Sequence, residues 1–190
     1  MRSSASTPNP SRSPAPGIAL FLRFAGEDHG RHCTGRRLVA TGFATATGAA
    51  RPAGAYALLL DPWAPTPLAP ADRARARSAG LLAIDCSWNR IRARGGLPPG
   101  LRQQPHRRRL PYLRAANPQH YGRLAELNTA EALAGALHIL GEPAQGAALL
   151  SGFAGASAFW EINAAAFEAY GGCASPEAVL EAERTMLAGA

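Results

Sequence analysis

Residues 110–132 read Leu-Pro-Tyr-Leu-Arg-Ala-Ala-Asn-Pro-Gln-His-Tyr-Gly-Arg-Leu-Ala-Glu-Leu-Asn-Thr-Ala-Glu-Ala and are the most informative stretch of this chain. Pro111 and Pro118 lack a backbone N–H, and Gly122 is conformationally free, so the three residues do not belong to one regular element. Most of the stretch is therefore predicted to be an ordered loop.

The end of this loop carries a helix-start signal. Asn128 can cap a helix, and Glu131, three residues later, can bond back to the amide of Asn128 in a capping box. A loop of apolar and amide-bearing residues that ends at free helix N–H groups can cradle a carboxylate or a nucleoside. The alternative is a buried connection between domains that binds no ligand.

Outward from this stretch, three apolar runs predict strands of a parallel sheet that is buried on both faces. They are residues 18–24, 56–60 and 81–84, and residues 71–79 between the last two are predicted to be a crossover helix. Thr34, Pro62 and the motif Asp85-Cys86-Ser87-Trp88 follow the ends of such runs. Because ligands gather at the carboxyl ends of parallel strands, these residues are predicted to meet at a binding site.

Everything after the loop is predicted to be helical. The expected helices are residues 128–140, 143–153 and 157–170, followed by one that Ser175 caps with Pro176 in its first turn. His138 lies on an apolar helix, where a core histidine is expected rather than a ligand. The predicted fold class is thus α/β, with a tail at residues 1–16, a parallel-sheet domain at 17–109 and a helical domain at 110–190, and with the binding site in the cleft between these domains.

The chain carries a set of short motifs in a fixed order. Cys33-Thr34-Gly35, Leu60-Asp61-Pro62 and Asp85-Cys86-Ser87-Trp88 come first; Leu110-Pro111-x-Leu113, Ala115-Ala116-Asn117-Pro118-x-x-Tyr121-Gly122 and Leu127-x-x-x-Glu131-Ala132 follow, and Phe153, Phe159, Glu161 and Asn163 come last. Any one motif is weak, whereas the whole set in the same order is strong. Over residues 18–188 the sequence resembles the family of small-subunit rRNA aminocarboxypropyltransferases.

This resemblance implies an activity, a cofactor and a fold. Members of the family transfer the 3-amino-3-carboxypropyl group of S-adenosylmethionine to N3 of a pseudouridine in small-subunit ribosomal RNA. The implied fold is a parallel-sheet domain of the SPOUT class with a trefoil knot, followed by an all-helical domain. Two alternatives stay open: a methyltransferase of the same fold that donates the methyl group of S-adenosylmethionine to RNA, and a non-catalytic ribosome-assembly factor that only binds RNA.

The resemblance also implies a cofactor site. Backbone groups of Ile84, Leu110 and Ala125 and the hydroxyls of Thr34 and Thr129 are expected to hold S-adenosylmethionine, and Leu60, Pro62, Trp88, Leu127 and Ala132 are expected to form apolar walls. Trp88 is expected near the methyl group, the alternative being an ordinary core tryptophan. The family's usual Asp-Pro-Lys before the threonine motif is His29-Gly30-Arg31 here, which leaves the shape of that loop open.

Asp85 is the candidate catalytic residue. At a strand end in a partly dry site, its carboxylate could favour the sulfonium of the cofactor or accept the N3 proton of the acceptor base. The alternative is an aspartate that is bonded to the N-terminus of a nearby helix.

The charge of the chain is distributed unevenly. All 20 basic side chains are arginine; up to Arg123, nineteen arginines against five acids give +14, and beyond it one arginine against eight acids gives −7. Residues 90–109 are predicted to be a mobile basic loop in which Arg92, Arg94, Arg107, Arg108 and Arg109 contact the RNA backbone. The alternatives are a solvated linker and a GC-rich genome that encodes arginine in place of lysine.

Composition excludes several other classes. No run of eighteen apolar residues could cross a membrane, and the Ser-, Pro- and Arg-rich tail has no secretory h-region. The three cysteines indicate neither disulfides nor a zinc knuckle, and Asp28, His29, His32 and Cys33 match no zinc spacing, so no metal is expected. We expect a cytoplasmic monomer whose partner is small-subunit rRNA or the pre-ribosomal subunit.

Overall fold

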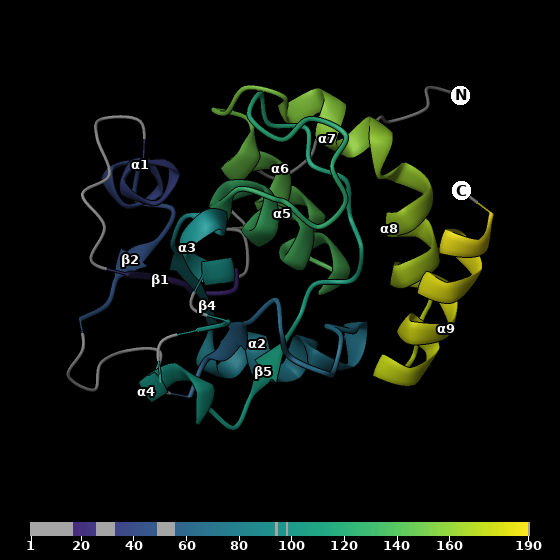
Figure 1. The fold of residues 1–190 in the computed structure, drawn as a ribbon, viewed down its shortest axis with the longest axis horizontal. Coiled ribbons are helices and arrows are strands. Elements are labelled where there is room, and N and C mark those ends of the chain that lie inside the picture. Colours follow the sequence, from purple (N-terminus) through teal and green to yellow (C-terminus); the bar gives the residue numbers. More distant parts are fainter. Residues whose placement is uncertain (1–16, 26–32, 49–55, 94, 98, 190) are drawn as a thin grey trace, which may run out of the picture.

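The three apolar runs form the centre of a parallel five-stranded sheet. In the computed structural model, which describes residues 17–25, 33–48, 56–93, 95–97 and 99–189, they are β1 (Leu20–Phe24), β3 (Leu58–Leu60) and β4 (Leu81–Asp85). Two short strands, β2 (Thr45–Ala46) and β5 (Arg107–Arg108), form the edges in the order β2-β1-β4-β3-β5. All pairings are parallel, as the continuous apolar runs predicted (Figure 1). The tail at residues 1–16 lies outside the described residues.

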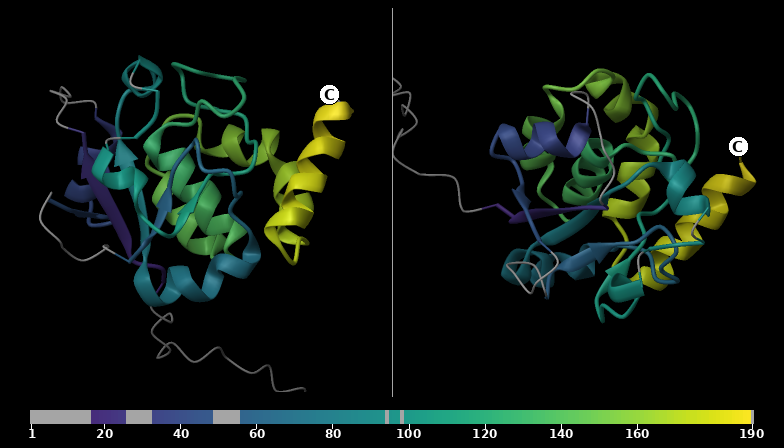
Figure 2. Two further views of the ribbon diagram at one scale, coloured as in Figure 1. Left: turned by 60° about the horizontal axis from the view of Figure 1, so that its bottom comes forward. Right: turned by 60° about the vertical axis from the view of Figure 1, so that its left-hand side comes forward.

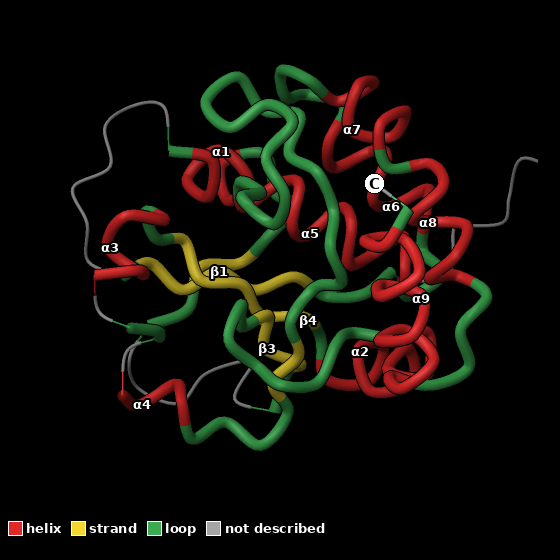
Figure 3. Tube along the Cα trace, turned by 45° about the vertical axis from the view of Figure 1, so that its right-hand side comes forward, coloured by secondary structure: helices red, strands yellow, loops and turns green. Residues whose placement is uncertain are grey.

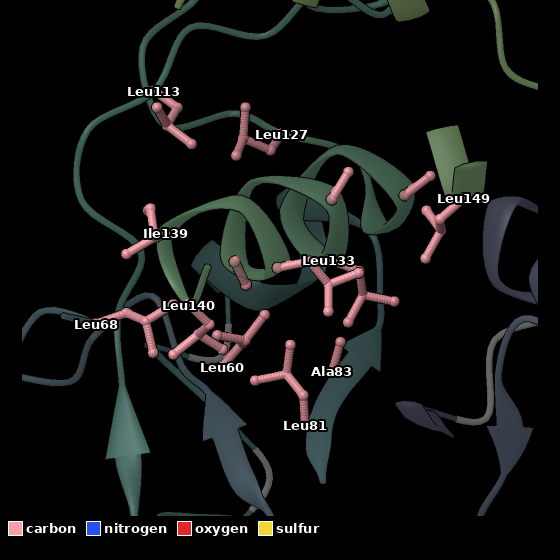
Figure 4. Packing of buried hydrophobic residues seen from close by; sticks show 14 of the residues in the cluster. Leu60, Leu68, Leu81, Ala83, Leu113, Leu127, Leu133, Ile139, Leu140 and Leu149 are labelled. Carbon is pink, nitrogen blue, oxygen red and sulfur yellow. The ribbon is translucent and has the colours of Figure 1, made fainter. Parts of the chain in front are cut away.

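The two faces of the sheet enter different parts of the core because side chains alternate along each strand. Leu22, Leu58 and Leu81 belong to the main core cluster, which includes helix α5 (Thr129–Ile139). Leu59 and Leu82 face the other way and pack with Leu97 and Leu101. Figure 4 shows Leu133 of α5 above Leu60, Leu81 and Ala83 of the strands.

Several short helices lie around the sheet. Helix α1 (Thr34–Ala40) follows β1, the single turn η1 (Pro70–Asp72) and α2 (Arg73–Ala79) connect β3 to β4, and α3 (Trp88–Ala93) and α4 (Pro99–Arg102) follow β4. The crossover helix between residues 56–60 and 81–84 is thereby confirmed. Figure 3 shows the yellow strands with α5 and α2 close to them.

Residues 90–109 are not the loop that the sequence predicted. They contain most of α3, all of α4 and β5. Leu97 and Leu101, each 2% exposed, fasten this segment to the second face of the sheet. The prediction was wrong for the described residues because it weighed the arginines and missed two apolar anchors between them.

The C-terminal half is helical, as predicted, with one helix divided in two. After α5 come α6 (Pro143–Leu150), α7 (Ala156–Ile162), α8 (Ala164–Gly171) and α9 (Pro176–Ala188). A single helix over residues 157–170 was expected, but Asn163 interrupts it. The side chain of Asn163 is buried and bonds to the backbone N–H and C=O of Arg114 and to the C=O of Phe159. These bonds fix the bend between α7 and α8.

Three buried polar side chains fasten residues 110–127, which we call the central loop. Glu131 accepts hydrogen bonds from the N–H of Ala116, the amide of Asn117 and the N–H of Asn128, at 2.6–2.9 Å. Asn163 holds the loop at Arg114, as described above, and Glu183 of α9 holds it at Tyr112. The predicted capping box at Asn128 is present, and Glu131 also anchors the loop. The central loop is ordered because its backbone groups find buried partners.

The parallel sheet and the C-terminal helices share one core. The main cluster contains strand residues such as Leu22 and helix residues such as Leu133, Phe159 and Val179. Ion pairs also cross between the basic and the acidic half of the chain, from Arg73 and Arg77 to Glu142 and from Arg109 to Glu183. In Figures 1 and 2, β1 and β2 lie towards one end of the molecule and α9 at the other. No helix of the described residues is long and apolar enough to cross a membrane.

Candidate active site

A cavity of about 770 Å³ opens at the carboxyl ends of β3, β4 and β5, where the central loop meets α5. Its volume lies within the range of about 300–1,000 Å³ that is usual for small-molecule sites. All ten residues expected to bind the cofactor line it, and so do Asp85, Arg92 and Arg109; the ten are Thr34, Leu60, Pro62, Ile84, Trp88, Leu110, Ala125, Leu127, Thr129 and Ala132. The cavity therefore brings together the residues that the motifs had placed far apart in the sequence.

Asp85 lies at the end of β4 with both carboxylate oxygens engaged. Oδ1 accepts a hydrogen bond from the hydroxyl of Thr129 at 2.7 Å, and Oδ2 accepts one from the thiol of Cys33 at 2.7 Å. Asp85 is 7% exposed and lines the cavity. Its carboxylate thus lies between the first residue of α5 and the residue that caps α1. This geometry is compatible with both roles considered for Asp85, a catalytic charge in the cavity and a hydrogen-bond acceptor at a helix N-terminus.

Cys33 and Gly35 contribute to the site in ways the sequence did not reveal. Burial, followed by the hydrogen bond to Asp85, raises the pKa of the Cys33 thiol, which keeps it protonated and able to donate. A Cβ at Gly35 would lie 2.6 Å from Oδ2 of Asp85, so only glycine leaves room for the carboxylate there. The motif Cys33-Thr34-Gly35 contained both residues, but their contact with Asp85 depends on the sheet pairing of β1 with β4.

Trp88 forms part of the cavity wall, at the start of α3. Its indole Nε1 donates a hydrogen bond to the backbone oxygen of Leu127 at 2.8 Å, which fixes the ring and joins α3 to the central loop. The side chain is half-buried and lines the cavity. A half-buried tryptophan that lines the cavity agrees better with the wall residue that the resemblance implied than with an ordinary core residue.

Beside Trp88, Glu126 collects three cationic or polar partners. Its carboxylate is ion-paired with Arg92, accepts from Arg123 at 3.2 Å and meets Nδ1 of His120 at 2.6 Å. The hydrogen bond from Arg92, with those of Arg123 and His120, lowers the pKa of Glu126 to about 2. Since His120, Glu126 and Arg92 all line the cavity, this network fixes one side of its mouth.

Ala125 has an unusual backbone conformation. Its φ of 61° is the only positive value at a non-glycine residue among those described. Its N–H donates to the backbone oxygen of Leu113 at 2.9 Å. A backbone contact from Ala125 to a ligand would therefore be made by its carbonyl oxygen. Such strained residues persist where the surroundings hold them and are frequent at functional sites. The geometry suits the backbone contact that the resemblance implied for this position.

The five arginines predicted to contact RNA have different surroundings. Arg107, Arg108 and Arg109 pair with Asp61, Asp72 and Glu183, whose side chains are 1–8% exposed. These three guanidinium groups are thus held by buried or nearly buried carboxylates, which favours a structural role. Arg92 is half exposed at the mouth of the cavity, and Arg94 lies outside the described residues.

Three further observations concern side chains outside this set. The cysteines are all free thiols. Within the described part of the chain, no group of three or more His, Cys, Asp or Glu residues could hold a metal ion; Asp28, His29 and His32 lie outside it. His138 packs against Phe167 and Trp160, with ring centroids 4.3 and 5.5 Å away, and burial lowers its pKa, as expected for a core histidine.

Comparison with known proteins identifies the family. Residues 58–187 match the family described as Ribosome biogenesis protein, C-terminal. The chain is 36% identical to the 16S rRNA aminocarboxypropyltransferase of Halobacterium salinarum over 90% of its own length and 97% of the relative. It is 43% identical to the enzymes of that name from Vulcanisaeta distributa and Methanopyrus kandleri, of which it spans 65% and 66%, just under two thirds.

The fold comparison agrees with the sequence comparison. The structure of the SAM-dependent rRNA:acp-transferase Tsr3 from Vulcanisaeta distributa superimposes with a TM-score of 0.78 at 35% identity, covering 90% of this chain and 89% of that one. The chain therefore belongs to the rRNA aminocarboxypropyltransferase family.

Proposed function

We propose that this protein transfers the 3-amino-3-carboxypropyl group of S-adenosylmethionine to small-subunit ribosomal RNA. The observation that carries the proposal is the cavity, which all ten predicted cofactor residues line together with Asp85. The names of the relatives and of the similar structure support the same reaction. We further propose that the acceptor atom is N3 of a pseudouridine.

The composition of the cavity suits this donor. Leu60, Pro62 and Leu127 offer apolar surface, and the hydroxyls of Thr34 and Thr129 offer polar contacts. The donor carries no polyphosphate, so no glycine-rich phosphate loop is needed. The Thr129 hydroxyl already donates its hydrogen to Asp85, so its oxygen can only accept a hydrogen bond from a ligand. It therefore suits a ligand group that donates hydrogen bonds, such as an ammonium.

S-adenosylmethionine supplies an activated carbon, so the protein's task is positioning and exclusion of water. In the proposed reaction, N3 of the acceptor base forms a bond to the γ-carbon of the aminocarboxypropyl group. The bond between that carbon and sulfur breaks, and the sulfur keeps the electron pair, which leaves methylthioadenosine. The N3 proton passes to a base or to solvent.

We propose that Asp85 acts through its charge. Both of its oxygens already accept a hydrogen bond, from Thr129 and from Cys33, which makes the carboxylate fixed and partly satisfied. A fixed negative charge in the wall of a mainly apolar cavity favours a cationic sulfonium or ammonium. Proton transfer to Asp85 from N3 would require one of these bonds to rearrange, and we therefore rank that role second.

Trp88 would select which carbon reacts. Its ring is fixed by the bond to Leu127, and it faces the cavity from the first turn of α3. We propose that the ring covers the methyl group of the donor and leaves the γ-carbon open to the acceptor.

We propose RNA contact through Arg92, which lines the cavity and is half exposed, in addition to any contact by Arg94, Arg107, Arg108 and Arg109. We also propose that the protein is a cytoplasmic monomer and has a SPOUT-like trefoil knot. The division into domains at residues 17–109 and 110–190 stays a proposal as well, with the two packed on one core.

A labelling experiment tests the reaction. The protein is incubated with small-subunit rRNA and with S-adenosylmethionine that is labelled in either the methyl or the carboxypropyl carbons. Carboxypropyl label in the RNA supports the proposal, methyl label supports an RNA methyltransferase, and RNA binding without transfer of either label supports an assembly factor.

A further inference from the structure

Two aromatic side chains at the cavity are not among the residues assigned to the donor. Trp63 and Tyr112 both line the cavity, yet 44% and 37% of their surfaces are exposed. Exposed aromatic rings that line a cavity are available to contact a ligand there. Trp63 follows β3, and Tyr112 follows the neighbouring edge strand β5.

The backbone of Trp63 is fixed by a buried carboxylate. Oδ1 of Asp61 accepts a hydrogen bond from the N–H of Trp63 at 3.0 Å, while Oδ2 accepts one from Nη1 of Arg107 at 2.9 Å. Asp61 is 2% exposed. One carboxylate therefore holds both an arginine of β5 and the turn that carries Trp63.

Tyr112 is fixed in the same way from the other end of the chain. Oε1 of Glu183 accepts hydrogen bonds from Nη1 of Arg109 at 2.6 Å and from the N–H of Tyr112 at 2.9 Å. The hydroxyl of Tyr170 donates to the oxygen of Tyr112 at 3.1 Å, and the Cζ atom of Arg109 lies 5.3 Å from the centre of the Tyr112 ring. The ring is thus held at its backbone and on one side.

These two arrangements repeat one design. In each, a buried carboxylate joins an arginine to the backbone N–H of an exposed aromatic residue. Arg107 and Arg109 are two residues apart along an extended edge that pairs with β3 and with Pro67. Side chains at that spacing point to the same side. The arginines that the sequence assigned to RNA therefore position two aromatic rings at the cavity.

We propose that Trp63 and Tyr112 form the stacking site for the acceptor base, an unpaired nucleobase of the RNA substrate. Enzymes that modify a base must take it out of its stack, and aromatic side chains replace the lost stacking. The site is continuous with the donor cavity, so a base held there faces the donor. This inference rests on the proposed function for the identity of the substrate, but its test requires only binding.

The test measures RNA affinity with and without the aromatic rings, and with and without the base. Two RNA hairpins that represent a small-subunit rRNA loop are compared, one with a single pseudouridine in the loop and one with an abasic site at that position, with S-adenosylhomocysteine in place of the donor. The wild-type protein should bind the abasic hairpin about 5- to 150-fold more weakly, as expected for one lost stacked base. Trp63→Leu and Tyr112→Leu should weaken binding of the intact hairpin and leave binding of the abasic hairpin unchanged.

Phe43→Leu is the matched control, since Phe43 is 38% exposed and does not line the cavity. It should behave as the wild type with both hairpins, and Trp63→Phe should restore most of the base-dependent affinity. Equal affinity of the wild type for the two hairpins would overturn the inference, and so would leucine variants that weaken both hairpins alike. Base-dependent binding without any transfer of label would refute the proposed function and leave this stacking site standing.

Discussion

The hydroxyl of Thr129 donates a hydrogen bond to Oδ1 of Asp85 over 2.7 Å, and this bond joins the end of β4 to the first residue of α5. Cys33 completes the arrangement at Oδ2. Three segments that are distant in the sequence therefore meet at one carboxylate, in the wall of the cavity.

Asp85→Asn should reduce the rate of transfer by about 10²-fold or more, because it removes a fixed charge from the reacting centre. Affinity for S-adenosylmethionine should fall by much less. Single-turnover transfer at saturating donor and RNA, with calorimetric affinity and the melting temperature, measures the difference. Thr129→Ser, which keeps the donor to Asp85, is the control and should retain most of the rate. A folded Asp85→Asn protein that transfers at the wild-type rate would make Asp85 purely architectural.

Trp88→Ala should weaken binding of S-adenosylmethionine by about 1–3 kcal/mol, because it deletes an aromatic wall of the cavity. Trp88→Phe keeps a ring but loses the hydrogen bond to Leu127, so it should bind more tightly than the alanine variant and separate the wall from the anchor. Isothermal titration calorimetry on both variants is the measurement. Unchanged affinity in a folded Trp88→Ala protein would show that Trp88 is an ordinary core tryptophan and not a wall of the cofactor site.

Arg109→Met should destabilise the protein by on the order of 3 kcal/mol, because it leaves the carboxylate of Glu183 buried without its charged partner. The Arg109 and Glu183 side chains are 16% and 4% exposed. Arg184→Met is the matched control: Arg184 and Glu181 are 73% and 69% exposed, so its effect should be at most about 1 kcal/mol. Urea unfolding gives both values, and equal effects of the two variants would refute the structural role of Arg109.

The lowered pKa of Glu126 means that the stability of the protein should decrease when this carboxylate is protonated at low pH. Its pKa falls from 4.5 to about 2 on folding, so its contribution is fully present above pH 4.5 and is lost as the pH falls towards 2. Glu126→Gln should remove this contribution. The difference in melting temperature between wild type and variant should be largest above pH 4.5 and should shrink on acidification. A difference that is constant from pH 6 to pH 2.5 would show that the ion pairs of Glu126 do not stabilise the fold.

The parts of the fold that local chemistry controls could be predicted from the sequence. The apolar runs became β1, β3 and β4, and Asn128 and Glu131 form the capping box. The residues expected to bind the cofactor came from ordered motifs, and all ten line one cavity. Such features depend on neighbours in the chain or on a pattern shared across a family, both of which one sequence displays.

Features that depend on distant partners could not be predicted in this way. The bend at Asn163 exists because that side chain bonds to Arg114, 49 residues away, and nothing in the helix pattern around Asn163 indicates that contact. Likewise the cluster at Arg107, Arg108 and Arg109 has the composition of an RNA-binding stretch, while each residue pairs with a carboxylate that lies 36 or more residues away. Tertiary partners decide the role of a charge, and composition does not reveal them.

The co-product of the reaction tests the central claim most directly. Transfer of the aminocarboxypropyl group leaves methylthioadenosine, whereas transfer of the methyl group leaves S-adenosylhomocysteine. The purified protein, incubated with S-adenosylmethionine and small-subunit rRNA and then analysed by chromatography with mass detection, should form methylthioadenosine only when RNA is present. Formation of S-adenosylhomocysteine, or of no co-product in the presence of RNA, would contradict the account.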